Sequence, residues 1–461
     1  MASTRYDVAV IGSGPAGHKG AIAAAKLRKK VVIIDRPNMM GGVCIQTGTI
    51  PSKTMREAIL YLTGAGQHSF YGKDYRVKDA ISAPDLSLRV QAVVDREVEV
   101  IRNQLRRNGV VTVIGTARFT GAHTLEVETA VGPQNIEAEK FLIACGTRSA
   151  FTPSIPLDGE KIFSAEQILS IKEIPREMIV VGAGVIGLEY ASMFAALGTK
   201  VTVIDQRPTL LDFVDREIIE ALGYHMRKLN AIFRLGESVT SVEVAENGRV
   251  IAKLDSGKQV HGEALLYTVG RTANSDLLNL AAAGLTADSR GKITVNSDFQ
   301  TSQPHIYAAG DVIGFPSLAS SSTEQGRLAS GHMFGEKCKA FPEVLPYGIY
   351  TIPEISTVGR NEQQLTADKV PYEVGIARYD ELAKGAILGD DTGLLKLLFD
   401  PSSLKLLGIH IIGERAAEII HIGQAVLALG GTIEYFRDTV FNYPTLAEAY
   451  KVAALAGLNR L

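Results

Sequence analysis

The chain has 461 residues, 46% of them hydrophobic and 45 of them glycine, a length and composition that suit roughly three domains of an α/β protein. Its 48 basic and 50 acidic residues give a net charge of −2, so charge gives no reason to expect nucleic acid or an anionic membrane as a partner. The basic clusters at 26–30 and 102–107 are interpreted as solvated helix ends.

The three cysteines, Cys44, Cys145 and Cys338, show neither a disulfide framework nor the spacing of metal ligands, so no metal is expected. Such cysteine usage is typical of a reducing compartment. Residues 1–5 resemble neither a signal peptide nor a transit segment, and no stretch is apolar over the length that a bilayer requires. The protein is expected to be soluble and cytoplasmic.

The first predicted elements are a strand at 6–11, a glycine-rich turn at 12–17, a helix to about residue 27 and a second strand that ends at Asp35. In such a turn the first glycine permits the bend, the second lets a pyrophosphate approach the backbone, and the third lets the helix pack on the strand. The acid follows the last glycine by 18 residues, the distance at which it reaches a ribose hydroxyl. The residues expected to hold this nucleotide are Gly12, Gly14, Gly17 and Asp35.

A long helix is predicted at 88–105, with apolar residues on one face. Alternating segments follow at 110–114 and 124–127, and they suggest a small β excursion.

The strand–turn–helix–strand plan is repeated from residue 178 onward, 170 residues after its first copy. A strand at 179–181 leads into a second glycine-rich turn at 182–187, a helix to about residue 197 and a strand that ends at Asp205. Two copies of equal pitch predict two dinucleotide-binding domains in one chain. The candidate ligands in this copy are Gly182, Gly184, Gly187 and Asp205.

Past the second copy, segments 239–244 and 249–254 flank Asn247-Gly248, a strong signal for a β-hairpin. From about residue 345 the pattern changes to strands at 394–399 and 407–412, followed by helices at 414–429 and 446–458. This part has no glycine fingerprint and is interpreted as a separate α+β domain without a nucleotide of its own.

Nucleotide choice depends on the end of the second copy. Asp205 favours NAD, because a carboxylate accepts a hydrogen bond from a free 2′-hydroxyl and repels a 2′-phosphate. Arg207 could bind that phosphate with two hydrogen bonds, or it could be a solvated residue at the strand end. An acid and an arginine together suit a site that accepts both NAD and NADP.

Residues 41–53, GGVCIQTGTIPSK, resemble the redox-active loop of the pyridine nucleotide-disulfide oxidoreductases, in which a second cysteine follows the first by five residues. Here Cys44 is followed by Thr49, whose hydroxyl cannot exchange with a disulfide. Cys44 could be a nucleophile of low pKa or a small buried thiol.

A second departure from the family lies near the C-terminus, in residues 442–448, NYPTLAE. Where the disulfide reductases carry an acid–base histidine, this chain has Tyr443, and phenols ordinarily titrate near pH 10. Glu448 is retained and is interpreted as a structural partner. Because both thiol-handling elements differ together, a different reaction is expected.

The resemblance also implies the fold and the cofactor. Residues 143–148 and 305–311 resemble flavin-domain segments, and Asp311 is expected to bind the ribityl chain of FAD. Residues 268–271 resemble the end of the nicotinamide-nucleotide domain. The expected fold is α/β, with two Rossmann-like domains and a C-terminal α+β dimerisation domain. The expected domains are an FAD-binding domain at 1–152, an NAD(P)-binding domain at 153–271, an FAD-binding return segment at 272–344 and an interface domain at 345–461.

Lys53 and Glu189 match a family ion pair that lies beside the reactive edge of the flavin. A cation there would stabilise the reduced ring. The alternative is that both are ordinary surface charges. The resemblance implies Lys53 and Glu189 as catalytic residues, and it adds Arg36, Gly42, Cys44, Thr49, Gly146, Arg207 and Gly270 to the glycines and acids named above as binding FAD, NAD or NADP.

The expected function is FAD-dependent hydride transfer between NADPH and NAD⁺, the activity of the family's Si-specific transhydrogenases, by a homodimer or larger homo-oligomer. The nicotinamide nucleotides are the expected substrates. Two alternatives stay open: an NAD(P)H-dependent diaphorase or quinone reductase, and a catalytically retired nucleotide-binding scaffold.

Overall fold

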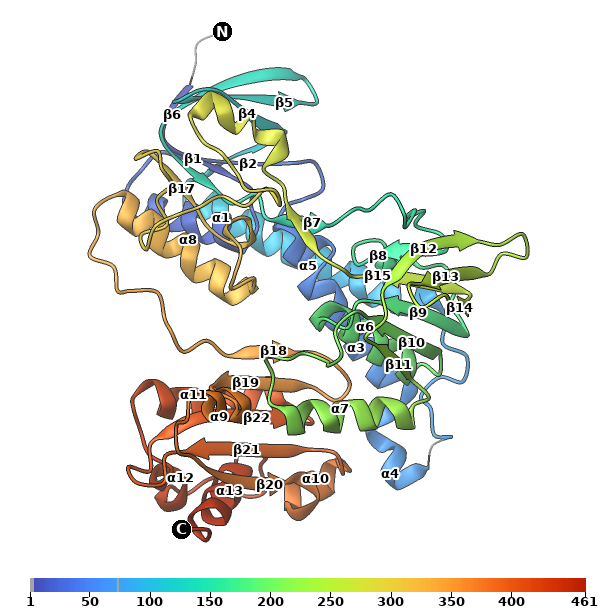
Figure 1. The fold of residues 1–461 in the computed structure, drawn as a ribbon. Helices are drawn as coiled ribbons and strands as arrows, with labels where there is room; N and C mark the ends of the chain where they lie inside the picture. Colours follow the sequence, from blue (N-terminus) through green and yellow to red (C-terminus); the bar gives the residue numbers. More distant parts are fainter. Residues whose placement is uncertain (1–3, 73) are drawn as a thin grey trace. The chain divides into compact units, whose positions relative to one another are not determined.

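The computed structural model describes residues 4–72 and 74–461, so residues 1–3, on which part of the N-terminal expectation rests, lie outside the described residues (Figure 1). The chain forms two compact units. Unit 1 comprises Met1–Thr54, Ser87–Phe151 and Val269–Pro342, and unit 2 comprises Met55–Leu86, Thr152–Thr268 and Glu343–Leu461. Among the described residues, no helix has the length and apolarity to span a bilayer.

Unit 1 is built on one seven-stranded sheet in the order β3-β2-β1-β6-β5-β4, with β17 next to β6. β1, β2, β3, β17 and the C-terminal part of β6 pair in parallel, whereas β4, β5 and the N-terminal part of β6 form an antiparallel meander. A separate two-stranded ribbon joins β7 to β16. The strands are β1 Thr4–Ile11, β2 Val31–Asp35, β3 Val111–Ile114, β4 Thr116–Gly121, β5 Thr124–Thr129, β6 Gly132–Ile143, β7 Thr147–Ser149, β16 Arg271–Ala273 and β17 Ile306–Ala308.

The helices α1 Pro15–Lys26, α2 Gly42–Gln46 and α8 Ala319–Met333 lie within unit 1. The boundary between the units falls inside two further helices, α3 Thr49–Thr63, which begins in unit 1, and α5 Ala83–Arg107, which begins in unit 2. The predicted helix at 88–105 is α5, which begins five residues earlier. α1 and α8 approach closely, since a Cβ atom on Gly326 would lie 2.0 Å from the carbonyl oxygen of Ala16. The Ser330 hydroxyl also donates a hydrogen bond to the Gly20 carbonyl, at 2.8 Å.

The prediction that residues 110–114 begin a β excursion is wrong. β3 pairs in parallel with β2, so it continues the main sheet, and the excursion consists of β4, β5 and the start of β6. β3 is an edge strand with mostly exposed side chains. Its sequence therefore alternates as that of a half-buried antiparallel strand does, although β3 pairs in parallel.

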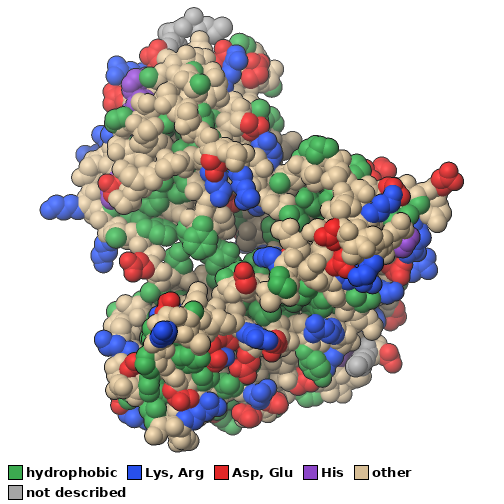
Figure 2. All heavy atoms as spheres, in the orientation of Figure 1, with side chains coloured by type: hydrophobic (Ala, Val, Ile, Leu, Met, Phe, Trp, Pro, Cys, Tyr) green, Lys and Arg blue, Asp and Glu red, His purple; other side chains and the backbone are tan. Residues whose placement is uncertain are grey.

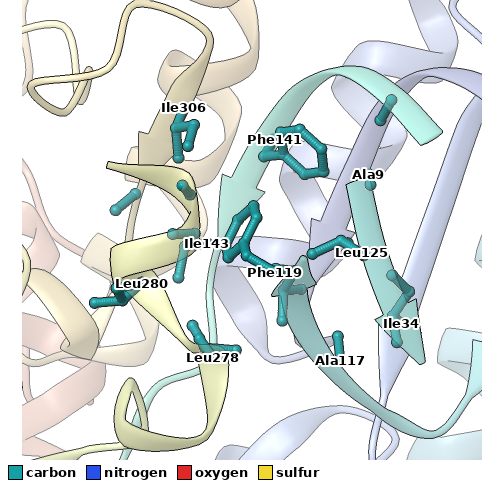
Figure 3. Close-up of a cluster of buried hydrophobic side chains, with 14 of the residues drawn as sticks. Ala9, Ile34, Ala117, Phe119, Leu125, Phe141, Ile143, Leu278, Leu280 and Ile306 are labelled. Carbon is teal, nitrogen blue, oxygen red and sulfur yellow. The ribbon is translucent and has the colours of Figure 1, made fainter. Parts of the chain in front are cut away.

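One apolar core of unit 1 lies between the meander and the return segment (Figure 3). Phe119 on β4 and Phe141 on β6 meet edge to face, with ring centroids 5.2 Å apart. Ile306 on β17 and Leu278 from the return segment join the same core. Segments far apart in the sequence therefore share one buried cluster.

Unit 2 contains a five-stranded parallel sheet in the order β11-β10-β9-β15-β8 and a three-stranded antiparallel sheet, β12-β13-β14. The predicted hairpin around Asn247-Gly248 is confirmed as β12 and β13. The strands are β8 Ile162–Ser164, β9 Glu177–Val181, β10 Lys200–Asp205, β11 Ile232–Leu235, β12 Val239–Val244, β13 Val250–Leu254, β14 Gln259–Gly262 and β15 Ala264–Tyr267, and the helices are α4 His68–Tyr71, α6 Val185–Ala196 and α7 Arg216–Lys228.

The C-terminal part of unit 2 is an antiparallel sheet in the order β18-β19-β22-β21-β20, with helices packed on it. The predicted α+β pattern is thus confirmed. The strands are β18 Tyr347–Ile349, β19 Ile355–Gly359, β20 Glu373–Arg378, β21 Leu394–Phe399 and β22 Leu406–Ile412, and the helices are α9 Glu362–Ala367, α10 Ala383–Leu388, α11 Ala416–Ala428, α12 Glu434–Asp438 and α13 Glu448–Leu458.

A charge cluster around one buried lysine joins α7 to the C-terminal sheet of unit 2. Lys396 on β21 is 2% exposed, and its ammonium lies 2.9 Å from Asp215, 3.0 Å from Glu217 and 2.7 Å from Glu362. Asp215 caps the N-terminus of α7 by accepting a hydrogen bond from the Glu217 N–H. Removing one partner of a buried ion pair strongly destabilises a folded protein, because the other charge is left buried without compensation. This cluster therefore holds α7 against β21. On the face in view, Figure 2 shows Lys and Arg side chains mixed with Asp and Glu, as the net charge of −2 suggests.

Beside this cluster, His410 on β22 is completely buried in its neutral form. Its Nδ1 lies 2.5 Å from the Thr357 hydroxyl and its Nε2 lies 3.0 Å from the Arg360 carbonyl. Burial lowers the pKa of His410 to about 4.

We expect His410 to make folding stability depend on pH. In the unfolded chain a histidine titrates near pH 6.5, so between that value and pH 4 the unfolded chain binds the proton more tightly. The contribution is fully present above pH 6.5 and falls by up to about 3 kcal/mol as the pH approaches 4. The variant His410→Gln keeps a donor and an acceptor but cannot titrate. As the pH is lowered from 7.5 to 4.5, the urea midpoint of the variant should therefore fall less than that of the wild type. A difference between the two midpoints that stays constant over this range would contradict the assignment.

Candidate active site

The first glycine turn joins β1 to α1 with no room for a side chain at its first and third glycines. Gly12 has a φ of +101°, and a Cβ atom there would lie 2.3 Å from the Ala144 carbonyl oxygen. A Cβ atom on Gly17 would lie 1.8 Å from the Gly12 carbonyl oxygen. The sequence therefore lets α1 pack directly on its own strand.

The N-terminus of α1 is open to an anion. Gly14, the N-cap, has an extended backbone and no side-chain cap, so the first-turn N–H groups have no partner from that residue. Gly42, with a φ of +66°, approaches so closely that its Cβ atom would lie 2.8 Å from the Gly14 Cα. The two backbones form a narrow cradle at a positive helix end, and such a cradle suits a pyrophosphate.

Asp35 faces the glycine turn. One carboxylate oxygen accepts from the Ser13 N–H at 2.7 Å and the Ser13 hydroxyl at 2.5 Å, and the other accepts from the Arg36 N–H at 2.8 Å. Burial raises the pKa of Asp35, and the bonds from Ser13 and Arg36 oppose that rise. A carboxylate has about four acceptor positions. These three donors leave one, on the oxygen that faces Arg36, for a ribose hydroxyl.

Asp311 belongs to a second polar group in unit 1. Its carboxylate accepts from the Thr147 hydroxyl at 3.3 Å, and that hydroxyl accepts from Nε of Arg271 at 2.8 Å. Burial raises the pKa of Asp311, whereas the charge of Arg271 and the Thr147 bond lower it. Gly146, with a φ of +64°, directly precedes Thr147. The sequence pattern gave Arg271 and Thr147 no role, although both lie in the segments that resemble the family.

The residues of unit 1 fit FAD. The open end of α1 and Gly42 suit its pyrophosphate, and Asp35 keeps an acceptor position toward a ribose. Asp311 lies beside the first turn of α1, because a Cβ atom on the preceding Gly310 would be 3.1 Å from the Ala16 Cβ. Two acids near one helix end match the ribose and the ribityl chain of FAD.

Cys44 and Thr49 lie on α2 and at the start of α3. Burial raises the pKa of the Cys44 thiol, and the hydrogen bond with Thr49 only partly offsets this effect. All three cysteines are free thiols, and burial raises the pKa of Cys145 to about 12. Cys44 is partly buried, and a neutral thiol is a weak nucleophile, so these properties favour its interpretation as a small packed thiol over that of a nucleophile of low pKa.

The second glycine turn repeats the first. A Cβ atom on Gly187 would lie 1.9 Å from the Gly182 carbonyl oxygen, whereas one on Gly184 would meet nothing within 4 Å. Gly184 is also the N-cap of α6 and provides no side-chain cap. The chain's own packing does not require a glycine at 184, so its absent side chain leaves space for a ligand to approach the N-terminus of α6.

Asp205, at the end of β10, is enclosed by hydrogen-bond donors. One oxygen accepts from the Ala183 N–H at 2.6 Å and from Nη2 of Arg207 at 2.9 Å. The other accepts from the Arg207 N–H at 2.8 Å and from Nε of Arg207 at 3.0 Å. Burial raises the pKa of Asp205, but these bonds outweigh it and hold the pKa below its usual value. The guanidinium binds the acid beside it while its side chain stays 39% exposed, so both interpretations of Arg207, the phosphate ligand and the solvated residue, stay predictions.

The expected pair of Lys53 and Glu189 stays a prediction, because the two residues belong to different units. The Lys53 ammonium lies 3.4 Å from the Ser52 hydroxyl. Glu189 on α6 is 4% exposed and accepts a hydrogen bond from the Tyr350 N–H at 2.9 Å, so the surface alternative is wrong for the glutamate. Gly270 lies in unit 1, where its carbonyl accepts from the Ala150 N–H at 3.1 Å.

Tyr443 does not occupy a buried acid–base position within this chain, since it is 72% exposed. Glu448 begins α13, and its buried Oε2 has no hydrogen-bond partner among the described residues. The interpretation of Glu448 as a structural partner therefore stays a prediction. The described residues also contain no group of three or more His, Cys, Asp and Glu side chains placed to hold a metal ion.

We expect the flavin-loaded protein to take up one hydride per flavin, because Thr49 stands where a second cysteine would pair with Cys44 and accept a further electron pair. In an anaerobic titration, one equivalent of NADPH should bleach the flavin fully and leave the count of free thiols unchanged. The variant Thr49→Cys, if it oxidises, should consume a second equivalent, and Cys44→Ser should behave like the wild type. A second equivalent consumed by the wild type, with new thiols, would contradict this assignment.

Comparisons with known proteins agree with this site. Residues 6–326 match the pyridine nucleotide-disulphide oxidoreductase family, and residues 345–454 match the dimerisation domain of that family. A soluble pyridine nucleotide transhydrogenase from Mycobacterium bovis is 54% identical over 458 residues, which cover 99% of this chain and 98% of that protein. One from Vibrio atlanticus is 46% identical over 464 residues, covering 100% of this chain and 99% of that protein.

Solved structures show the same fold with lower identity. LpdA from Mycobacterium tuberculosis has a TM-score of 0.90, and the flavoprotein disulfide reductase RclA from Escherichia coli has a TM-score of 0.87. Each is 26% identical and covers 98% of this chain and 99% of the other. The two glycine turns, the flavin-side acids and these matches lead to one conclusion: this chain belongs to the pyridine nucleotide-disulphide oxidoreductase family.

Proposed function

We propose that this protein transfers hydride between NADPH and NAD⁺ with FAD as its cofactor. The observation that carries the proposal is the retention of both dinucleotide sites together with the loss of the thiol relay at Thr49. The relatives at 44–54% identity that carry the name soluble pyridine nucleotide transhydrogenase support it. A flavin, when bound, accepts a hydride from one nicotinamide and gives it to another.

The chain's own residues bind and position the reactants in this proposal. Gly12, Gly14 and Gly17 bring the pyrophosphate of FAD to the N-terminus of α1. Asp35 holds its ribose, and Asp311 holds its ribityl chain. Thr147 and Arg271 keep the Asp311 carboxylate oriented.

The nicotinamide nucleotides bind unit 2 at the N-terminus of α6, with Asp205 and Arg207 at the adenosine end. Since one such turn serves both nucleotides, they bind in succession. Lys53 and Glu189 are proposed as the catalytic pair beside the flavin, where the ammonium stabilises negative charge on the reduced ring.

The protein acts as a homodimer through residues 345–461, since most of this segment matches a dimerisation domain. Its few free cysteines support a cytoplasmic location. We keep the division into domains at 1–152, 153–271, 272–344 and 345–461, and we propose Si-specific transfer at C4 of the nicotinamide.

We expect purified protein to be yellow and to reduce thio-NAD⁺ with NADPH. Cys44→Ser should keep this exchange within about twofold of the wild type, because no thiol takes part. Lys53→Met should lower kcat by at least about tenfold, in line with the loss of an electrostatic group at the reacting ring. NADPH deuterated at either C4 position tests the Si assignment.

Two results would contradict the proposed reaction. Faster turnover with a quinone than with a nucleotide acceptor would favour a diaphorase. A bound flavin that neither NADH nor NADPH bleaches under anaerobic conditions would favour a scaffold without activity.

A further inference from the structure

The two ribose-site acids differ in how many of their acceptor positions the chain already uses. Asp35 and Asp205 both end the second strand of their fold, 18 residues after the third glycine. Three hydrogen bonds reach Asp35, and one acceptor position is left. Four reach Asp205, which fills about all that a carboxylate has.

Half of the donors to Asp205 come from one side chain. The guanidinium of Arg207 places Nε on one carboxylate oxygen and Nη2 on the other, at 3.0 Å and 2.9 Å. This is the bidentate geometry in which arginine binds carboxylates most firmly. A ribose hydroxyl can therefore reach Asp205 only where the guanidinium moves away.

The Arg207 side chain is free to make that move, but its backbone is not. The side chain is 39% exposed, whereas that of Asp205 is 8% exposed. The Arg207 N–H binds the Asp205 carboxylate, and the Arg207 carbonyl accepts from the Gly236 N–H at 3.1 Å. Asp212, an exposed acid nearby, also attracts the guanidinium and supports its charged form.

We infer that Arg207 is a two-position gate that sets nucleotide choice, covering Asp205 in one position and binding the 2′-phosphate of NADP(H) in the other. This inference rests on the proposed function, because it concerns the site that both nucleotides share. When the guanidinium leaves, it frees one acceptor position on each carboxylate oxygen. That pair matches the neighbouring 2′- and 3′-hydroxyls of NAD(H).

The gate has opposite effects on the two nucleotides. NAD(H) must displace the guanidinium and gains nothing from it, so Arg207 weakens NAD(H) binding. NADP(H) also displaces it but gains charge-assisted bonds to the phosphate. A plain phosphate-binding arginine would strengthen NADP(H) binding and leave NAD(H) unaffected, so the effect on the unphosphorylated ligand distinguishes the two roles.

The test uses the full-length, flavin-loaded protein and two ligands without a nicotinamide, adenosine 5′-monophosphate and adenosine 2′,5′-bisphosphate, measured by isothermal titration calorimetry. Arg207→Met should bind the monophosphate more tightly, by up to about fivefold, the range of partly exposed ion pairs. It should bind the bisphosphate at least about tenfold more weakly. Arg207→Lys keeps the charge without the fork, and should bind the monophosphate more tightly while retaining part of the bisphosphate affinity.

Arg216→Met is the matched control, because Arg216 is an exposed arginine of the same unit that pairs with Glu220. It should leave both affinities unchanged. In steady-state kinetics, Arg207→Met should lower KM for NAD⁺ and raise KM for NADPH with kcat nearly constant, since the nicotinamide end is untouched.

Monophosphate binding that is weaker or unchanged in Arg207→Met would overturn the gate. Because neither adenosine ligand reacts, that result is independent of hydride transfer. Failure of the wild type to reduce thio-NAD⁺ would reject the proposed function while leaving the binding measurements interpretable.

Discussion

The contact on which both nucleotide sites depend is the approach of a helix to the carbonyl of its own turn. Any side chain at Gly17 would put a Cβ atom 1.8 Å from Gly12, and the corresponding distance from Gly187 to Gly182 is 1.9 Å. With the helix in direct contact, its first N–H groups lie at the carboxyl end of the sheet. The acids at the ends of β2 and β10, and Asp311 after β17, are all placed relative to that junction.

A single residue accounts for much of the difference between the two sites. Ser13 in the first turn donates its hydroxyl to Asp35 and accepts from the Gly41 N–H at 2.9 Å, which connects the turn to the loop that carries Cys44. The corresponding residue of the second turn is Ala183, which has only its backbone N–H to offer. A hydroxyl built into the turn suits a cofactor that stays, whereas a mobile guanidinium suits substrates that exchange.

The sequence was sufficient for the local parts of this structure. Periodicity and glycine spacing predicted the strand–turn–helix units, and Asn247-Gly248 predicted its hairpin, because each depends on neighbouring residues. The strand at 111–114 was misjudged since its partner, β2, is separated from it by α5, and alternation does not reveal whether pairing is parallel.

The polar groups that position the site were less accessible to sequence reasoning. Arg271 reaches Thr147 across 124 residues, and Glu189 accepts from a backbone N–H 161 residues away. No spacing rule identifies such partners. The Arg207 fork, by contrast, spans two residues, and the sequence indicated its chemistry but not that the guanidinium would lie on Asp205.

The packing of α8 on α1 bears on how the protein is made. Ser330 meets Gly20 across 310 residues, and the inserted segments of unit 2 are translated between them. At bacterial or eukaryotic elongation rates of about 5–20 residues per second, the first helix waits about 15–60 s on the ribosome for the one that covers it. During that interval a nascent chain displays the small, apolar face of α1 to the cell, and α8 can cover that face only when synthesis has passed residue 333.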